Sequence, residues 1–167
     1  GTIEFWVGAD WQTDPGYDPV ILANAGEQGA SYLIAMLRDR DGLAFVSGSQ
    51  EEVVTFNFAD GRFHHVALRI WPQEGIDVMV DGKFVGSADI NVQDLPSAGL
   101  WLGTMDGSSS PYVGAIAALR IWRPVLPAEV LIEYSMQDVF ASVHPNIDQL
   151  IAISDFSSGQ LLVVQPQ

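Results

Sequence analysis

The stretch RFHHVALRIWPQEGIDVMVDGKFVG, residues Arg62 to Gly86, decides the fold. Apolar residues alternate with other residues along HHVALRIW, GIDVMV and KFVGSA, which is the period of β-strands. Asp81 and Gly82 stand between the last two runs, and this pair readily adopts the positive φ angles of a type I′ turn. The stretch therefore predicts successive antiparallel strands, the last two joined in a tight hairpin.

Two adjacent histidines, His64 and His65, open this stretch and raise the question of chemistry. Neighbouring residues of a strand face opposite sides of its sheet, so the pair cannot converge on one metal ion or one reacting group. Alternation puts Val66 and Leu68 on one side, and His65 and Ala67 on the other. We predict that both histidines make structural hydrogen bonds.

Period-two patterning extends outward from this stretch in both directions. Short runs rich in β-branched and aromatic residues, bounded by Gly, Asp, Asn or Ser, are typical of strands. They occupy residues 2–9, 20–25, 32–38, 42–47, 52–58, 64–71, 75–80, 83–88, 99–104 and 115–122. One short surface helix is predicted near Pro127–Gln137. The pattern favours an all-β fold, a two-sheet antiparallel jelly-roll sandwich.

Composition narrows the function classes. The 167 residues, 48% of them apolar, suit one sizeable domain. Seven basic against 21 acidic residues give a net charge of −14, which excludes binding to nucleic acid and anionic membranes because both need cationic groups. There is no cysteine, so no disulfide or thiolate zinc site. No apolar run is long enough for membrane insertion.

Five motifs in order are similar to laminin-G-like domains of the concanavalin A-like lectin/glucanase superfamily, close in pattern to the pentraxin branch. They are TIEFWVGAD, FHHVALRI, IDVMVDGKFVGS, LWLGT and YVGAIAALRIWRPVLPAEVL, and they cover Thr2 to Gln137. The resemblance implies a jelly roll of two packed sheets. It also implies that FHHV begins a strand packed at the sheet edge.

The superfamily that the sequence resembles includes glycoside hydrolases, so catalysis is one function that the resemblance allows. Retaining glycosidases need two carboxylates about 5 Å apart. The resemblance implies a strand of the type Glu-x-Asp-x-x-Glu for that purpose, and this sequence has no match. The nearest acidic pair, Asp77 and Asp81, places Asp81 in the hairpin turn. We therefore predict a protein that is not an enzyme.

The first loop that favours binding is ADWQTDPGYDP, residues Ala9–Pro19. Trp11 and Tyr17 offer aromatic platforms for a sugar, and Asp14 offers a carboxylate for its hydroxyls. Asp10 and Asp18 have the spacing to converge on calcium, which takes six to eight oxygens. The alternative is that Trp11 closes the end of the core while the aspartates turn the loop.

The second loop is GTMDGSSSPYVG, residues Gly103–Gly114, with Tyr112 as a further ligand-binding candidate. In calcium-binding relatives the equivalent connection supplies metal ligands, and Asp106 matches best. Only one carboxylate stands here, which departs from the pentraxin double-calcium pattern. One prediction is a single calcium ion held by Asp106 and backbone carbonyls, with or without a first-loop aspartate (Asp10 or Asp18), and a solvated serine-rich turn is the other.

The remaining candidates are tryptophans in or beside strands and a pair of aspartates in a turn. Trp71 precedes Pro72 at the end of a strand and is predicted to be an exposed ligand-binding residue of the rim. Trp6, Trp101 and Trp122 are predicted in the core or on sheet faces. The aspartates of RDRDG, Asp39 and Asp41, indicate a hairpin turn and not a calcium loop.

These observations predict a non-enzymatic recognition module that binds glycan, or mediates adhesion, through rim loops. We expect it to be extracellular or on the cell surface, in a larger bacterial protein with neighbouring domains. Residues 1–143 form the predicted jelly roll, and 144–167 a tail that is an extra hairpin or the start of another module. The alternative function is a structural or protein-interaction domain without a small ligand.

Overall fold

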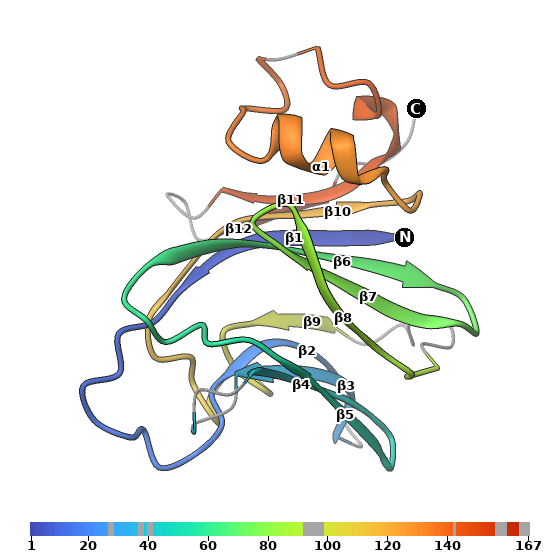
Figure 1. Cartoon of the computed structure of the whole chain (residues 1–167). Coiled ribbons are helices and arrows are strands. Elements are labelled where there is room, and N and C mark those ends of the chain that lie inside the picture. Colours follow the sequence, from blue (N-terminus) through green and yellow to red (C-terminus); the bar gives the residue numbers. More distant parts are fainter. Residues whose placement is uncertain are drawn as a thin grey trace.

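The computed structural model describes residues 1–26, 29–36, 39, 42–91, 99–141, 143–155 and 160–163. Within these residues two antiparallel sheets lie face to face (Figure 1). The first has the order β12-β11-β10-β1-β6-β7-β8. Its strands are β1 (Thr2–Gly8), β6 (Phe63–Trp71), β7 (Gly75–Val80), β8 (Lys83–Ala88), β10 (Ala115–Trp122), β11 (Leu150–Asp155) and β12 (Gln160–Val163).

The second sheet has the order β5-β4-β3-β2-β9 within the described residues. Its strands are β2 (Val20–Gly26), β3 (Gly29–Met36), β4 (Gly42–Ser47), β5 (Gln50–Thr55) and β9 (Gly99–Leu102). The two-sheet antiparallel sandwich predicted from the period of two is therefore confirmed. The predicted turn is also confirmed, since Asp81 and Gly82 have φ angles of 50° and 76° between β7 and β8.

Some strand predictions need correction. The strand expected at residues 52–58 is β5 at Gln50–Thr55, and Phe56 and Phe58 follow it as core residues of a loop. β6 was expected at a sheet edge, but it lies between β1 and β7 in the interior of its sheet. Asp39 lies in a turn, while Asp41 falls outside the described residues.

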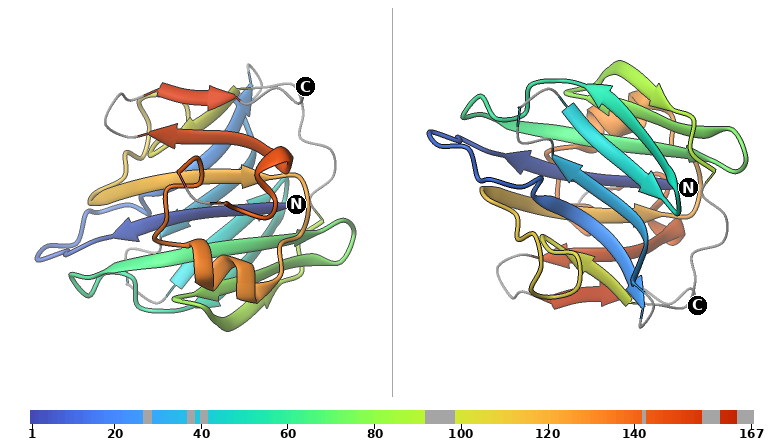
Figure 2. Two further views of the ribbon diagram at one scale, coloured as in Figure 1. Left: turned by 90° about the horizontal axis from the view of Figure 1, so that it is seen from above. Right: turned by 90° about the horizontal axis from the view of Figure 1, so that it is seen from below.

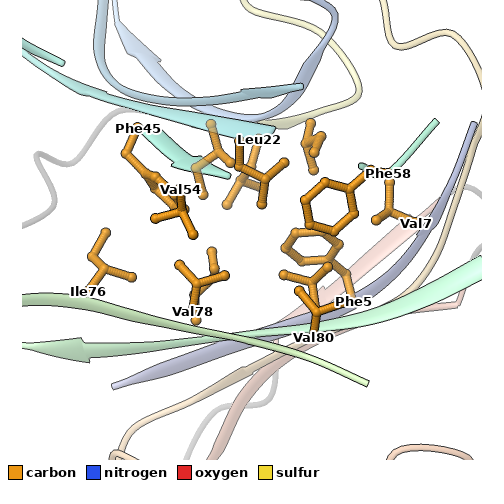
Figure 3. Packing of buried hydrophobic residues seen from close by; sticks show 14 of the residues in the cluster. Phe5, Val7, Leu22, Phe45, Val54, Phe58, Ile76, Val78 and Val80 are labelled. Carbon is orange, nitrogen blue, oxygen red and sulfur yellow. The ribbon is translucent and has the colours of Figure 1, made fainter. Parts of the chain in front are cut away.

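The main core fills the space between the sheets. Figure 3 shows aromatic and aliphatic side chains from both sheets meeting there. Phe5 and Val7 of β1, with Val78 and Val80 of β7, face Leu22 and Phe45 of the other sheet. Burying one such side chain contributes roughly 1.5–3 kcal/mol. This interdigitated layer fixes the sheets and therefore the loops that join them.

Part of the outer face of the seven-stranded sheet, away from the five-stranded sheet, is covered by residues 123–141 and 143–149, here called the cap segment (Figures 1 and 2). It contains helix α1 (Ala128–Tyr134) and the 3-10 turn η1 (Ile147–Gln149). The predicted helix thus exists, but it is not merely a surface helix. Its Leu131 is 2% exposed in a second apolar cluster. That cluster is formed by Ala67, Met79, Trp122, Leu126, Leu131, Val139 and Leu150.

A buried polar cluster lies beneath the cap segment. Glu4, which is 2% exposed, accepts hydrogen bonds from Trp122 Nε1 at 2.8 Å and is bonded to His65 Nε2 at 2.8 Å. Arg120 lies 3.5 Å from the same carboxylate and donates to the cap carbonyls of Tyr134 and Gln137 at 2.9 and 2.6 Å. Buried charges persist only when paired and hydrogen-bonded. This cluster therefore pins the cap segment to the sheet.

The two histidines have the structural roles predicted from their alternation. His65 lies under the cap segment on Glu4, whereas His64 faces the other side of β6, against the rings of Phe56 and Phe58. The ring nitrogens of His64 lie 2.7 Å from Asp81 and 3.1 Å from Asp60. His64 thus ties the start of β6 to the β7–β8 turn.

The tail after the cap segment extends the seven-stranded sheet. β11 pairs with β10, and β12 pairs with β11, both antiparallel. The residues between β11 and β12, 156–159, fall outside the described part. Whether residues 144–167 are a unit apart from 1–143 stays a prediction. Helix α1 has seven residues, and no helix among the described residues is suited to crossing a membrane.

Candidate functional site

The structure brings the two predicted binding loops together at one end of the sandwich. Residues 9–19 and 103–114 are here called the rim. Hydrogen bonds join these two loops to each other. Val20 N–H donates to the Ser110 carbonyl at 3.0 Å, and Tyr17 hydroxyl donates to the Pro111 carbonyl at 2.9 Å. Both loops lie at the end where β1 finishes and β10 begins (Figure 1).

Two of the predicted ligand-binding residues, buried Trp11 and half-buried Tyr112, make hydrogen bonds that hold the rim together. Trp11 is 3% exposed and donates from Nε1 to the Val113 carbonyl at 2.7 Å. Tyr112 donates its hydroxyl to the Gly8 carbonyl at 3.1 Å, and burial raises the pKa of Tyr112 above its usual value. A sugar needs an open ring face for stacking. Trp11 as a platform is therefore wrong, and the alternative, that it closes the end of the core, holds.

The other predicted residues of the first loop are accessible. Asp14 is exposed, and its carboxylate accepts the Gly16 N–H at 2.7 Å, which shapes a tight local turn. Asp10 is exposed and accepts bonds from the Gln12 amide at 3.2 and 3.3 Å. Tyr17 is half-buried and Asp18 is exposed. Tyr17, Asp14 and Asp18 as binding residues stay predictions.

Asp106 organises the second loop. Its Oδ1 accepts bonds from Ser108 N–H, Ser108 hydroxyl and Ser109 N–H, and its Oδ2 accepts the Ser109 hydroxyl at 2.8 Å. These bonds, led by those from Ser109, lower the pKa of Asp106 to about 2. The carboxylate is therefore ionised at neutral pH and bound within its own turn.

The structure does not assemble the predicted trio of metal ligands. Asp106, Asp10 and Asp18 are exposed, and no three acidic or histidine side chains among the described residues are grouped to hold a metal ion. The oxygens of Asp106 turn toward serines of its own loop instead of toward the first loop. A calcium ion held by Asp106, backbone carbonyls and one first-loop aspartate does not need such a group. Asp106, Asp10 and Asp18 as calcium ligands therefore stay predictions.

Trp101, which was not predicted as a binding residue from the sequence, lies beside the second loop. Trp101 of β9 is 40% exposed, whereas its neighbours Leu100 and Leu102 pack against the core. Alternation therefore places the indole on the outer face of the five-stranded sheet. The pattern Leu-Trp-Leu carried this signal, because a strand with two core leucines must turn the residue between them outward.

The second loop is shaped to fit this indole. Gly107 has a φ of +94°, and a Cβ at this position would lie 3.0 and 3.1 Å from two ring carbons of Trp101. Only glycine therefore combines that backbone angle with that close approach. The backbone of Gly107 supports the ring at one side, next to the Asp106 turn. An exposed indole held beside a polar, ordered turn forms the candidate binding site.

Trp71 does not belong to the rim. Gly8, at the rim end of β1, pairs with Phe63, whereas Thr2, at the far end, pairs with Arg69. Trp71 follows Arg69 at the end of β6, about 26 Å along the strand from Phe63 at 3.3 Å per residue. The expectation that Trp71 joins the rim loops is therefore wrong. Its 37% exposed ring lies at the opposite end of the sandwich.

Two antiparallel sheets packed face to face make this chain a β-sandwich protein. The chain belongs to the Concanavalin A-like lectin/glucanases superfamily, whose laminin-G profile matches residues 1–131. This confirms the resemblance drawn from the five sequence motifs. A search of curated proteins found no match.

Several solved structures share the fold. A proposed carbohydrate-binding protein of Bacteroides ovatus has a TM-score of 0.71 and 20% identity, covering 95% of this chain and 45% of that chain. A SAP-like pentraxin from Limulus polyphemus has a TM-score of 0.60 and 14% identity, covering 78% and 67%. Domain 4 of an extracellular arabinanase from Geobacillus stearothermophilus, solved with arabinotriose, has a TM-score of 0.57 and 18% identity, covering 79% and 64%.

At these identities the similarity shows the fold alone. The chain spans less than half the length of the Bacteroides ovatus protein that it matches.

Proposed function

We propose that this chain is a non-enzymatic module that binds glycan at the rim, with the Trp101 indole as its stacking platform. The observation that carries the proposal is that Trp101 is 40% exposed and supported by Gly107 beside the Asp106 turn. Sugar rings stack their C–H faces on such indoles. The fold similarity to a proposed carbohydrate-binding protein and to a domain solved with arabinotriose supports the same class of ligand.

Polar groups beside Trp101 suit sugar hydroxyls. Asp106 Oδ1 accepts three hydrogen bonds from its loop, but Oδ2 accepts one, which leaves a lone pair on Oδ2 for a hydroxyl donor. The Ser108 and Ser109 hydroxyls donate to Asp106, so their own oxygens can accept. Because the turn is already hydrogen-bonded, binding would order few additional groups.

The arrangement of carboxylates supports binding without catalysis. A retaining glycosidase needs two carboxylates about 5 Å apart, poised over one bond. Glu4, on β1, is buried under the cap segment and bonded to Trp122 and His65. Asp77, on β7, is held by Trp71 and Ser87. These two carboxylates come from different strands and each is bound to its own neighbours, so they do not form such a pair.

We place this module outside the cell, within a larger protein that has neighbouring domains. The similarity to a domain of an extracellular arabinanase supports this setting. Affinity per site is expected in the range of about 1 µM to 1 mM. Repetition of binding domains in one protein would raise the avidity.

The test is a broad glycan array, run with calcium and with chelator, followed by titration of the bound glycan. Replacing Trp101 by alanine is expected to weaken binding about tenfold, since ring stacking contributes roughly 0.5–1.5 kcal/mol beyond the buried area. The matched control is Phe140→Ala, which removes a 62% exposed ring from the cap segment and should leave affinity unchanged. An array without any bound glycan would reject the proposal.

A second candidate function, protein interaction without a small ligand, has its own observation. Four large apolar side chains of the cap segment are strongly exposed: Ile132, Met136, Phe140 and Val143 at 53%, 81%, 62% and 93%. Exposed apolar patches are typical of protein docking surfaces. If the array is empty, binding to a neighbouring domain of the same protein that is lost in Phe140→Ser would favour this second function.

A further inference from the structure

A row of polar side chains crosses the outer face of the seven-stranded sheet at the end opposite the rim. Arg69 of β6 pairs with Asp77 of β7, which pairs with Ser87 of β8. All three face outward, because the residues next to them, such as Leu68 and Val78, belong to the main core. Trp71 follows two residues after Arg69 on the same face.

These side chains are held in a defined arrangement. Trp71 Nε1 donates to Asp77 Oδ2 at 3.2 Å, and Ser87 hydroxyl donates to Asp77 Oδ1 at 2.9 Å. The guanidinium carbon of Arg69 lies 5.5 Å from the centroid of the Trp71 ring, a cation–π distance. Two hydrogen-bond donors therefore orient the Asp77 carboxylate. The Trp71 indole is oriented by that carboxylate and by the Arg69 guanidinium.

Arg69 has no acidic partner among the residues that the structure describes. It stands directly opposite Asp77, yet no carboxylate among the described residues lies within 4.0 Å of its guanidinium, because Asp77 is engaged by Trp71 and Ser87. Its Nε atom is buried and has no hydrogen-bond partner in the described part of the chain. An arginine carries five donors in a planar fork, so this group retains unused donors.

An arginine with no counter-ion in the described part of the chain stands out in this protein. The chain has 21 acidic and only seven basic residues, so most of its surface repels anions. Arg69 is half-buried beside a 37% exposed indole, which combines a cationic fork with an apolar ring surface. Such a fork binds a carboxylate with two parallel hydrogen bonds.

The remaining groups narrow the ligand class. Trp71 offers a surface for the C–H face of a sugar ring, and Asp77 and the exposed Ser87 offer acceptors for its hydroxyls. The carboxylate of Asp77 next to Arg69 disfavours phosphate and sulfate, which concentrate negative charge without hydroxyls to donate. A ring with one carboxylate and several hydroxyls matches each of these groups.

We propose that Arg69, Trp71, Asp77 and Ser87 form a second binding site, for saccharides that contain uronic acid. The Arg69 fork pairs with the carboxylate of one uronate residue, the Trp71 indole stacks on its ring, and Asp77 and Ser87 accept its hydroxyls. Arg69 and Trp71 lie about 20 and 26 Å along β6 from Phe63 at the rim end, and the site does not depend on the function proposed at the rim.

Titration calorimetry of the whole chain with trigalacturonate at low salt tests the proposal. Binding in the millimolar range or tighter is expected, and trigalacturonate methyl ester should bind at least tenfold more weakly because it lacks the carboxylate charge. Arg69→Gln and Trp71→Ala should each lower affinity about tenfold. Arg123→Gln removes an exposed arginine from the cap segment, and Trp101→Ala removes the rim platform; both should stay within twofold.

A measurement on the unchanged chain guards against a variant that fails to fold. The indole N–H resonance of Trp71, assigned by comparison with Trp71→Ala or Trp71→Phe, should shift with trigalacturonate and not with its methyl ester. The proposal is overturned by the absence of binding at about 10 mM ligand, by equal binding of the ester, or by an unmoved Trp71 resonance. Equal competition by inorganic sulfate would reduce the site to a general anion site and would also overturn it.

Discussion

The replacement Glu4→Gln tests whether the buried polar cluster holds the cap segment on the sheet. The Glu4 carboxylate is 2% exposed and is the counter-ion of Arg120, itself 6% exposed. Glutamine has nearly the same shape, so the change removes charge without opening a cavity. Because Trp122 Nε1 can only donate, the new amide oxygen must face Trp122, and the amide nitrogen then faces His65.

The size of the effect follows from this geometry. Removing one partner of a buried ion pair typically costs about 3–5 kcal/mol, since the other charge is left buried. Arg120 keeps its bonds to the Tyr134 and Gln137 carbonyls, and a His65 ring with the proton on Nδ1 can accept from the new amide through Nε2. Both adjustments place the expected loss at the lower end, about 3 kcal/mol.

Urea unfolding followed by tryptophan fluorescence measures this loss. With a slope of about 2 kcal/mol per M, the midpoint should fall by about 1.5 M. The matched control is Glu133→Gln, on the exposed side of α1, which should change stability by no more than about 0.5 kcal/mol. The double variant Glu4→Gln with Arg120→Met should lose less than the sum of the single variants, because it leaves no unpaired charge.

A loss below about 1 kcal/mol in Glu4→Gln would refute this reasoning, as would strict additivity in the double variant. Either result would mean that the cap segment is held by apolar packing of Leu126, Leu131 and Val139 alone.

Three further predictions follow from other parts of the chain. Stability should decline as the pH falls below 6.5, because burial lowers the pKa of His144 in the folded chain. The Nδ1 atom of His144 accepts the Asn146 N–H at 3.1 Å. Protonation of His144 therefore favours the unfolded chain. A second decline should begin below pH 4.5, since the pKa of Glu4 is also lowered in the fold: desolvation opposes this shift, but bonds from His65 and the charge of Arg120 outweigh it. Urea midpoints measured between pH 7 and 3 follow both declines in stability. The His144 prediction would be contradicted if the wild-type midpoint did not change between pH 7 and 5. It would also be contradicted if the His144→Gln variant showed the same decline as the wild type. Gly82→Ala should lower the melting temperature, because residue 82 has a φ of +76° and a Cβ would lie 2.7 Å from Ile132 Cγ1. Adding Ile132→Ala should restore part of the lost melting temperature. An unchanged melting temperature in Gly82→Ala would count against this contact. If calcium binds at Asp106, millimolar calcium must raise the melting temperature relative to chelator and Asp106→Ala must abolish the rise, whereas equal melting temperatures would reject the calcium prediction.

The layers of the fold could be predicted from local patterns. Alternation within strands shows which residues share a face, and the Asp81–Gly82 pair fixes one hairpin because its φ angles are an intrinsic preference of those residues. The opposite orientations of His64 and His65 follow from the same period of two. These features depend on residues close together in the chain, and for that reason the sequence predicts them.

The candidate sites depended on contacts between distant residues. Trp11 and Trp101 are both tryptophans near a loop, yet Trp11 is closed off by a bond to Val113, while Trp101 stays exposed beside Gly107. The placement of Trp71 far from the rim follows from the register of β1 against β6. No local pattern contains that register.

The sequence by itself thus determined the sandwich, its tight hairpin and the acidic character of its surface, because period, turn preference and charge are local properties. Only the folded arrangement shows that Glu4 meets Trp122, 118 residues away, and that no carboxylate of the described residues pairs with Arg69. The physical reason is that burial and pairing of polar groups are set by which strands become neighbours, and many registers are compatible with one alternating pattern.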